Sequence, residues 1–261
     1  MQHETSKNHD HEPKEHTHHE AEVTHETHHK KAKFELTTPI AILLGAIFIA
    51  VGLLGHGIFS KGKSGELSYL EAFTGKSPLE EKHVEGKKSN DVYFVEYSDT
   101  ECPYCIAFHK TMSELRQKYA GKVTFVYRHF PLAFHEGALP EAIQMNCVGK
   151  LAGDKAYFDF MTKMFDYKVT NKAPKITEEF SDSFIKANNI DKVAFTSCRQ
   201  DPVMKAEVEA SLQDGADAGV TGTPTSYVLV RDGDVFKVVK RLEGASQTSF
   251  IVPIIDKALG L

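Results

Sequence analysis

Hydrophobic and polar residues are distributed unevenly along the chain, and their pattern divides it into parts of different physical character. Residues 1–33 contain no Ile, Leu, Phe or Tyr and consist mainly of His, Glu, Thr and Lys. Such a segment cannot bury enough apolar surface to offset the conformational entropy that folding removes. We therefore expect a disordered His-rich tail over residues 1–35.

An almost uninterrupted apolar run follows the tail. Residues 36–60 contain no Asp, Glu, Lys or Arg, and a helix of about 20 apolar residues is long enough to cross the hydrocarbon core of a bilayer. The run therefore predicts a single transmembrane helix that remains as a membrane anchor. A cleavable signal peptide is the alternative, but about 35 residues precede the run and Gly55-His56-Gly57 is a poor cleavage site.

Charge and cysteine placement predict how this anchor is oriented. Three lysines lie within positions 30–33 and two within 61–63, which weakly favours a cytoplasmic N-terminus. All four cysteines follow residue 100, on the side where an oxidising compartment is expected. We therefore predict a single-pass protein of the cell membrane whose C-terminal part is extracytoplasmic.

The rest of the chain has the pattern of a folded domain. Residues 61–88 carry scattered Gly, Ser and Pro and predict a linker, so the domain is expected over residues 89–261. The apolar run 92–97 is typical of a strand buried on both faces. A helical pattern over 103–119 and a second strand over 122–130 follow it.

The second half of this domain begins with helices and returns to strands. Residues 135–218 have a helical pattern throughout and predict an inserted α-helical subdomain. Two strand-like runs, 225–230 and 235–241, flank Asp232-Gly233, a dipeptide typical of hairpin turns. A last helix is expected over 246–259. The order strand, helix, strand, helical insert, hairpin, helix predicts an α/β fold.

Composition and charge narrow the classes of function. The chain of 261 residues has a net charge of -5 at pH 7 and lacks the basic stripe of nucleic-acid-binding proteins, so no nucleic-acid partner is expected. Nine of the 14 histidines lie in the first 29 residues. The near-repeats at 16–20 and 25–29 suit weak binding of zinc, copper or nickel. The alternative is a solvated low-complexity tail.

The motif Cys102-Pro103-Tyr104-Cys105 carries the clearest chemistry. Pro103 suits the first helical position, which places Cys102 at the helix N-terminus, where the dipole and unpaired N–H groups favour a thiolate. Cys105 is then the resolving thiol. The alternative is half of a zinc site, which needs another close Cys or His pair, whereas Cys147 and Cys198 are isolated. We therefore expect redox chemistry and no metal ligands here.

Glu96 interrupts the apolar strand six residues before Cys102. An unpaired buried carboxylate is unfavourable, so Glu96 is expected to have a raised pKa and to transfer a proton beneath Cys105. The alternative is a solvated carboxylate at the edge of the sheet. His109 follows Cys105 by one helical turn, and we expect it to be an ordinary surface histidine.

Several motifs together resemble one known family. The chain resembles the thioredoxin-fold thiol–disulfide oxidoreductases, in particular the DsbA-like branch with a helical insertion, over about residues 84–260. The motifs that carry the resemblance are Glu96-Tyr97-Ser98-Asp99, Cys102-Pro103-Tyr104-Cys105, Arg128-His129-Phe130-Pro131-Leu132 and Gly219-Val220-Thr221-Gly222-Thr223-Pro224-Thr225. The resemblance implies a thioredoxin-like α/β fold with an inserted α-helical subdomain.

The resemblance also implies roles for residues around the cysteines. Pro224 is expected to be cis and to face the Cys-x-x-Cys motif, with the backbone of Thr223 pairing with a substrate strand. Pro103 and Tyr104 would contact the substrate as well. The dipeptide departs from the best-known member, which has Pro-His there, and the redox potential stays open.

A second cysteine pair follows from the same resemblance. Cys147 and Cys198 lie where many DsbA-like relatives carry another pair, which implies a structural disulfide. The alternative is two separate buried thiols.

The combined interpretation is a membrane-anchored, monomeric dithiol oxidase that introduces disulfides into reduced extracytoplasmic proteins. No nucleotide, flavin or metal motif is visible, so we expect no cofactor other than the Cys102–Cys105 disulfide itself. The resemblance implies reoxidation by a quinone-coupled membrane protein. One alternative is a reductase or isomerase of the same fold, although residues 60–88 are too short for the dimerisation domain of such isomerases. The other is a non-enzymatic, His-rich metal-binding surface protein.

Overall fold

The computed structural model describes residues 70–261, all of them in the second of two units into which the chain divides after Phe59. The predicted tail, the predicted transmembrane helix and residues 61–69 of the predicted linker lie outside the described residues. Within residues 70–261, no helix combines the length and hydropathy that crossing a membrane requires.

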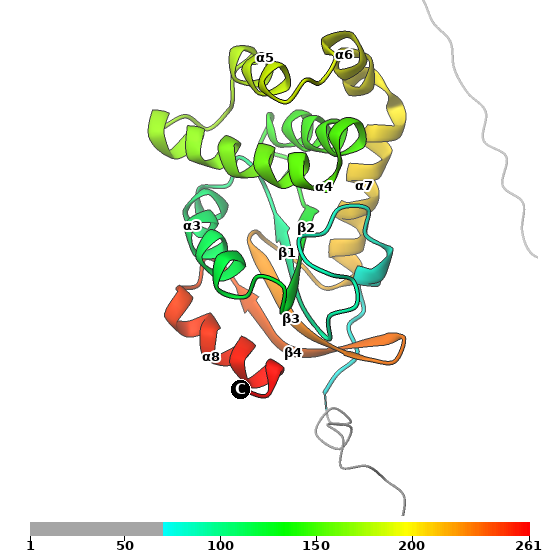
Figure 1. Cartoon of the computed structure of the whole chain (residues 1–261), viewed down its shortest axis with the longest axis vertical. Coiled ribbons are helices and arrows are strands. Elements are labelled where there is room, and N and C mark those ends of the chain that lie inside the picture. The colour runs from blue at the N-terminus through cyan, green and yellow to red at the C-terminus, as the bar shows by residue number, and fades with distance from the viewer. Residues whose placement is uncertain (1–69) are drawn as a thin grey trace, which may run out of the picture. The chain divides into compact units, whose positions relative to one another are not determined.

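A four-stranded sheet of order β2-β1-β3-β4 forms the centre of the described unit (Figure 1). Its strands are β1 (Val92–Ser98), β2 (Val123–His129), β3 (Thr225–Asp232) and β4 (Val235–Glu243). β1 runs parallel to β2 and antiparallel to β3, and β3 and β4 form the predicted hairpin. All of β1 is buried, because strands flank both its edges and helices cover both faces of the sheet.

Helices cover the two faces of this sheet with separate apolar clusters. Helices α3 (Pro103–Lys118) and α8 (Thr248–Leu259) pack on one face, where Leu115 and Ile251 share a cluster with Phe94 of β1. Helix α7 (Pro202–Asp217) lies against the opposite face. The remaining elements are η1 (Pro78–Glu80), α4 (Ala138–Asn171), α5 (Glu178–Ala187) and α6 (Lys192–Gln200).

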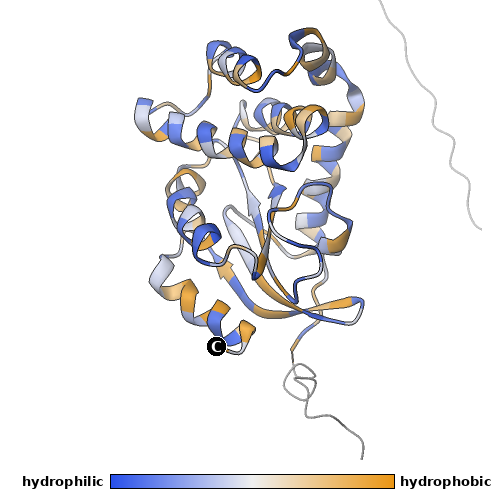
Figure 2. Ribbon diagram, viewed as in Figure 1, coloured by the Kyte–Doolittle hydropathy of each residue, from blue (hydrophilic) through white to orange (hydrophobic). Residues whose placement is uncertain are grey.

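The predicted helical insert is present as α4 to α7. Helix α4 consists of two helical segments that meet at Gly153, where the backbone is non-helical with a φ of +81°. Glycine adopts this conformation without the steric cost that a Cβ would add. Hydrophilic and hydrophobic residues are interleaved along the helices of the insert (Figure 2), as expected for helices that bury one face. Their buried side chains form a cluster that also contains Cys102 and Cys105.

A disulfide joins Cys147 of α4 to Cys198 of α6 across 51 residues. It connects the first and third helices of the insert, and Met145 and Phe195 of the same two helices are buried in the insert's apolar cluster. The alternative of two separate thiols therefore does not apply.

The segment before β1 is part of the folded unit. We call residues 70–90 the strap. Phe73 N donates to Phe236 O of β4 at 2.8 Å, and Glu85 N donates to Phe125 O of β2 at 2.9 Å. The strap thus pairs with both edge strands, which leaves fewer unpaired backbone groups there. The predicted linker is corrected accordingly for residues 70–88. The strap pairs with each edge strand through a single bridge. Such short pairings do not require the alternation of apolar and polar residues by which a strand is predicted.

Arg128 of β2 connects the strap to the sheet and to α7. Its side chain is 2% exposed, and its guanidinium lies 2.8 Å from both Glu81 and Asp214. It also donates to the Tyr97 hydroxyl and to Lys76 O, each at 2.7 Å. A buried guanidinium is tolerated only where its donors are satisfied, so the strap and α7 both depend on this residue.

Removal of the Cys147–Cys198 disulfide will destabilise the protein. Closing a loop of 51 residues stabilises by about 4 kcal/mol in the chain-entropy model. We expect the double variant Cys147→Ala/Cys198→Ala to lose about this much in chemical denaturation. The reduced wild type, with all four thiols free, should behave like the variant, and equal midpoints of the variant and the oxidised wild type would rule out a stabilising role.

Replacement of Arg128 will also destabilise the protein, because Glu81 and Asp214 would lose the guanidinium with which they both pair. We expect Arg128→Leu to lower the free energy of unfolding by about 3–5 kcal/mol. The matched control is Arg199→Leu, whose exposed pair with Glu178 should contribute at most about 1 kcal/mol. Equal losses in the two variants would contradict a special role for Arg128.

Candidate active site

The Cys102-Pro103-Tyr104-Cys105 motif lies at the start of α3, as predicted. Cys102 is the N-cap residue, with extended backbone, and Pro103 occupies the first helical turn. Cys102 is 4% exposed and Cys105 is 1% exposed, and both are free thiols. Tyr104 between them is 69% exposed. Both cysteines are therefore buried, Cys105 more fully than Cys102, and the exposed side chain of Tyr104 lies between them in the sequence.

The two sulfurs have opposite electrostatic environments. A hydrogen bond from the Cys105 thiol is the largest of several effects that lower the pKa of Cys102 to about 5. The backbone N–H groups of Tyr104 and Cys105 add to it, while burial opposes it. Burial, together with the neighbouring Cys102 sulfur, raises the pKa of Cys105 well above its ordinary value. Near neutral pH this pair therefore holds a thiolate at Cys102 and a thiol at Cys105.

Glu96 lies beneath this pair on β1. It is 6% exposed, and burial raises its pKa to about 7, although Ser98 and Arg116 act in the opposite direction. Its charge contributes to the raised pKa of Cys105, so the two groups are close. Because β1 has a neighbouring strand on each side, the alternative of a solvated carboxylate at the sheet edge is wrong. A carboxyl group with this pKa can either donate or accept a proton near neutral pH.

The loop before β3 forms the other side of the site. The Thr223–Pro224 peptide bond is cis, and the Cys102 sulfur lies 3.4 Å from Thr223 O. The structure therefore places the predicted Thr223-Pro224 pair directly beside the sulfur of Cys102.

Asp99 positions the start of the motif, a role that was not predicted although Asp99 is part of the Glu96-Tyr97-Ser98-Asp99 motif. Its buried carboxylate accepts from the backbone N–H groups of Glu101 at 2.7 Å and Cys102 at 3.2 Å. Its other oxygen accepts from Leu132 N at 2.7 Å and contacts His135 Nδ1 at 2.8 Å. One side chain thus ties the start of α3 to the loop after β2. The available signal was an Asp three residues before the helix N-cap, a type common at helix starts.

A buried ion pair from the insert supports the same turn. Lys168 of α4 is fully buried, contacts the carboxylate of Glu141, and donates to Thr100 O at 2.7 Å. Glu141 Oε1 in turn accepts from Ile176 N at 2.9 Å. No local pattern could have revealed this contact, because Lys168 lies 68 residues from Thr100.

His109 differs from its prediction as a surface residue. It is 6% exposed, its ring stacks on Phe165 at 4.8 Å, and burial lowers its pKa to about 3. The helix face that carries His109 packs against α4 of the insert, so this residue is a neutral core side chain. Within residues 70–261, no group of three His, Cys, Asp or Glu side chains is arranged to hold a metal ion.

Comparisons with known proteins agree with this architecture. Wolbachia pipientis α-DsbA1 superposes with a TM-score of 0.59 at 22% identity, covering 70% of this chain and 94% of that one. Wolbachia pipientis α-DsbA2, described as a thiol-disulfide exchange protein, gives a TM-score of 0.54 at 22% identity, covering 67% and 86%. At these identities the likeness concerns the fold.

One comparison with a curated relative covers a shorter region. The Na(+)/H(+) antiporter NhaA 1 of Mycolicibacterium gilvum is 34% identical over 83 residues, which are 32% of this chain. The chain spans only 13% of the length of that antiporter.

The family assignment rests on a broader match. The family model described as thioredoxin matches residues 79–246, a range that includes the Cys-x-x-Cys motif, Glu96, the helical insert and Thr223-Pro224. This range is more than half of the chain and agrees with the fold of the DsbA-like structures. The chain therefore belongs to the thioredoxin family and has a thioredoxin-like α/β fold with a helical insertion.

Proposed function

We propose that this protein is a thiol–disulfide oxidoreductase that acts as a dithiol oxidase through Cys102 and Cys105. The observation that carries the proposal is the asymmetry of the two sulfurs. Cys102, at the N-cap of α3, has a pKa lowered to about 5, and the more fully buried Cys105 has a raised pKa. A reactive pair needs one sulfur that is both attacked and expelled easily and a second that is protected from the substrate.

The same asymmetry favours the oxidising direction. A hydrogen-bonded thiolate at Cys102 stabilises the reduced form of the pair, and a stabilised reduced form makes the corresponding disulfide a stronger oxidant. The enzyme named α-DsbA2, with the same fold, is described as a thiol-disulfide exchange protein, which supports exchange chemistry as the general class.

The reaction proceeds in two exchanges. A substrate thiolate attacks the Cys102 sulfur of the Cys102–Cys105 disulfide, and Cys105 leaves and takes a proton from Glu96. A second substrate thiolate then attacks the substrate sulfur of the mixed disulfide, and Cys102 leaves as a thiolate. The substrate loses two electrons and two protons to become a disulfide, and the enzyme gains the two electrons. Thr223-Pro224, Pro103 and Tyr104 hold the substrate strand beside Cys102.

Location and partners complete the proposal. We infer a monomer anchored by residues 36–60 in the cell membrane, with the redox domain outside the cytoplasm. The Cys147–Cys198 disulfide supports an oxidising compartment. The substrates would be reduced extracytoplasmic proteins, and a quinone-coupled membrane protein would restore the Cys102–Cys105 disulfide.

The direction of the reaction can be tested with the purified full-length protein. We expect it to oxidise a reduced multi-cysteine protein, and Cys102→Ser to abolish this activity. In equilibrium with glutathione, its potential should lie closer to the about -120 mV of strong oxidants than to the about -270 mV of thioredoxin. A value near the reductant end would contradict the oxidase proposal, and activity that survives in Cys102→Ser would contradict the active site.

The hydrogen bond from Cys105 predicts how Cys102 titrates. In the reduced wild type, the thiolate absorbance should appear with a midpoint near pH 5. Cys105→Ala removes the donor that stabilises the thiolate, so the pKa of Cys102 should rise, whereas Cys105→Ser keeps a donor and should shift it less. Identical midpoints in all three proteins would show that Cys105 does not stabilise the Cys102 thiolate.

A further inference from the structure

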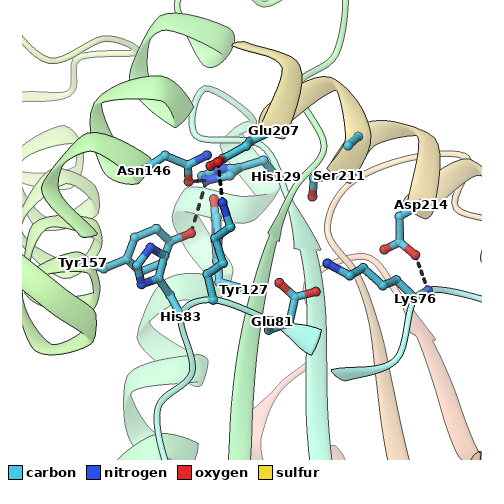
Figure 3. A pocket seen from close by; sticks show the side chains of 12 residues that line it. Lys76, Glu81, His83, Tyr127, His129, Asn146, Tyr157, Glu207, Ser211 and Asp214 are labelled. Carbon is cyan, nitrogen blue, oxygen red and sulfur yellow. Dashed lines mark hydrogen bonds and ion pairs between the residues drawn. The ribbon is translucent and has the colours of Figure 1, made fainter. Parts of the chain in front are cut away.

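A cavity at the edge of β2 lies next to the residues beneath Cys105. It has a volume of about 170 Å³ and is open to solvent between the strap, α4 and α7. Figure 3 shows Tyr127, His129, Tyr157 and His83 grouped on one side of it. The Tyr157 hydroxyl lies 3.2 Å from His129 Nε2, which also contacts Asn146 Oδ1 at 3.0 Å. The cavity is therefore lined by polar groups that can hydrogen-bond to water.

Tyr127 connects this cavity to Glu96. The two residues are neighbours in the register of β1 and β2, and Tyr127 also lines the cavity. Tyr127 is 6% exposed, and its hydroxyl makes no hydrogen bond among the described residues. Buried hydroxyls are nearly always paired with protein or water, so the free hydroxyl at a polar cavity indicates a site for water.

Ser98 follows Glu96 by two residues on β1, so the two side chains lie on the same face of the sheet. Its hydroxyl is also buried without a hydrogen bond among the described residues, yet it is near enough to lower the pKa values of both Glu96 and Tyr127. Burial raises the pKa of Tyr127 well above its ordinary value, and the charges of Glu96 and Cys105 act in the same direction. Tyr127 therefore stays protonated and, like Ser98, can donate one proton while it accepts another.

We propose that the hydroxyls of Ser98 and Tyr127 pass a proton between Glu96 and water in the cavity at the edge of β2. The proposal rests on the proposed function and adds two positioning residues to it. Its consequence is that the enclosed sulfur exchanges its proton with solvent by a path separate from the surface at which the substrate reacts with Cys102.

The proton balance follows from the first exchange. The substrate thiolate attacks Cys102, the S–S bond breaks, and Cys105 leaves with the electron pair. Glu96 gives its proton to Cys105 and becomes a carboxylate. A proton from water in the cavity then moves to Tyr127 as Tyr127 passes its own through a bridging water to Ser98, and Ser98 passes one in the same way to Glu96. Reoxidation of the enzyme runs this transfer in reverse.

Other charged or titratable groups interact with Glu96 and must be considered when a pH profile is interpreted. Arg116 and Cys105 act from α3, and Tyr127 acts from β2. Tyr157 acts from α4, since the charge of Glu96 contributes to its raised pKa. A change in Tyr127 that keeps its ring leaves all of these groups in place.

The test compares Tyr127→Phe with the wild type in single-turnover reaction of the oxidised full-length protein with a dithiol peptide. We expect the rate of mixed-disulfide formation near neutral pH to fall by about tenfold. Loss of a direct general acid would lower the rate by about a hundredfold or more, but here water can replace the missing hydroxyl in the path. The solvent isotope effect on this step should rise, while the midpoint of the Cys102 titration should stay as in the wild type. Tyr93→Phe is the matched control, since Tyr93 is a buried tyrosine of β1 whose hydroxyl donates to Lys88 O at 2.6 Å.

Two further variants test the same proton path if Tyr127→Phe does not fold. Ser98→Ala interrupts the same path, and Ser211→Leu places an apolar side chain at the lining of the cavity, with exposed Glu209→Leu as its control on α7. Both should slow the same step without moving the Cys102 titration. The proposal is overturned if the test variants react as fast as their controls with the same isotope effect. Failure of the proposed function is distinguishable, because the wild type would then be no faster than Cys102→Ser.

Discussion

The carboxylate of Asp99 is the constraint on which the geometry of this site depends. A charge with no access to solvent must be surrounded by donors, and here those donors are the N–H groups of Glu101 and Cys102, the N–H of Leu132 and the ring of His135. Satisfying one buried charge thus brings the start of α3 and the loop after β2 together. The position of the Cys102 backbone at the start of α3 follows from this arrangement. So does the enclosure of Cys105 beneath the first turn of α3.

Buried charges also hold the helical insert and the strap in place, through contacts between residues that are farther apart in the chain. Lys168 reaches from α4 to the carbonyl of Thr100, so the insert holds the turn that precedes the motif. Arg128 holds the strap and α7 against the sheet through Glu81 and Asp214. Buried ion pairs of this kind contribute little net stability, but breaking one leaves an uncompensated charge. They therefore act mainly by specifying how the insert, the strap and α7 pack against the sheet. Cys105, Glu96 and the cavity at the edge of β2 lie among these packed elements.

The features that could be predicted from the sequence are those with a local physical cause. The N-cap position of Cys102 follows from Pro103 and the helical pattern after it, and the burial of Glu96 follows from the apolar residues on either side of it in β1. The hairpin of β3 and β4 follows from Asp232-Gly233. The pairing of Cys147 with Cys198 and the location of Thr223-Pro224 beside Cys102 came from family resemblance, because neither follows from spacing. Three features were not predicted: the burial of His109, the role of Asp99 and the pairing of the strap with the sheet. Each depends on residues that are far away in the chain.

By itself, the sequence determined the order of the elements, the reactive cysteine pair and the presence of one carboxylate within an apolar strand, because periodicity and helix-end chemistry act over a few residues. Only the tertiary structure decided how far the pKa values of the two sulfurs differ, since burial of Cys105 by the insert raises its pKa and its thiol then stabilises the thiolate of Cys102. The structure likewise decided that Tyr127, the partner of Glu96 in the register of β1 and β2, lines a cavity at the edge of β2. Desolvation and charge proximity depend on distance in space, and the fold alone sets that distance.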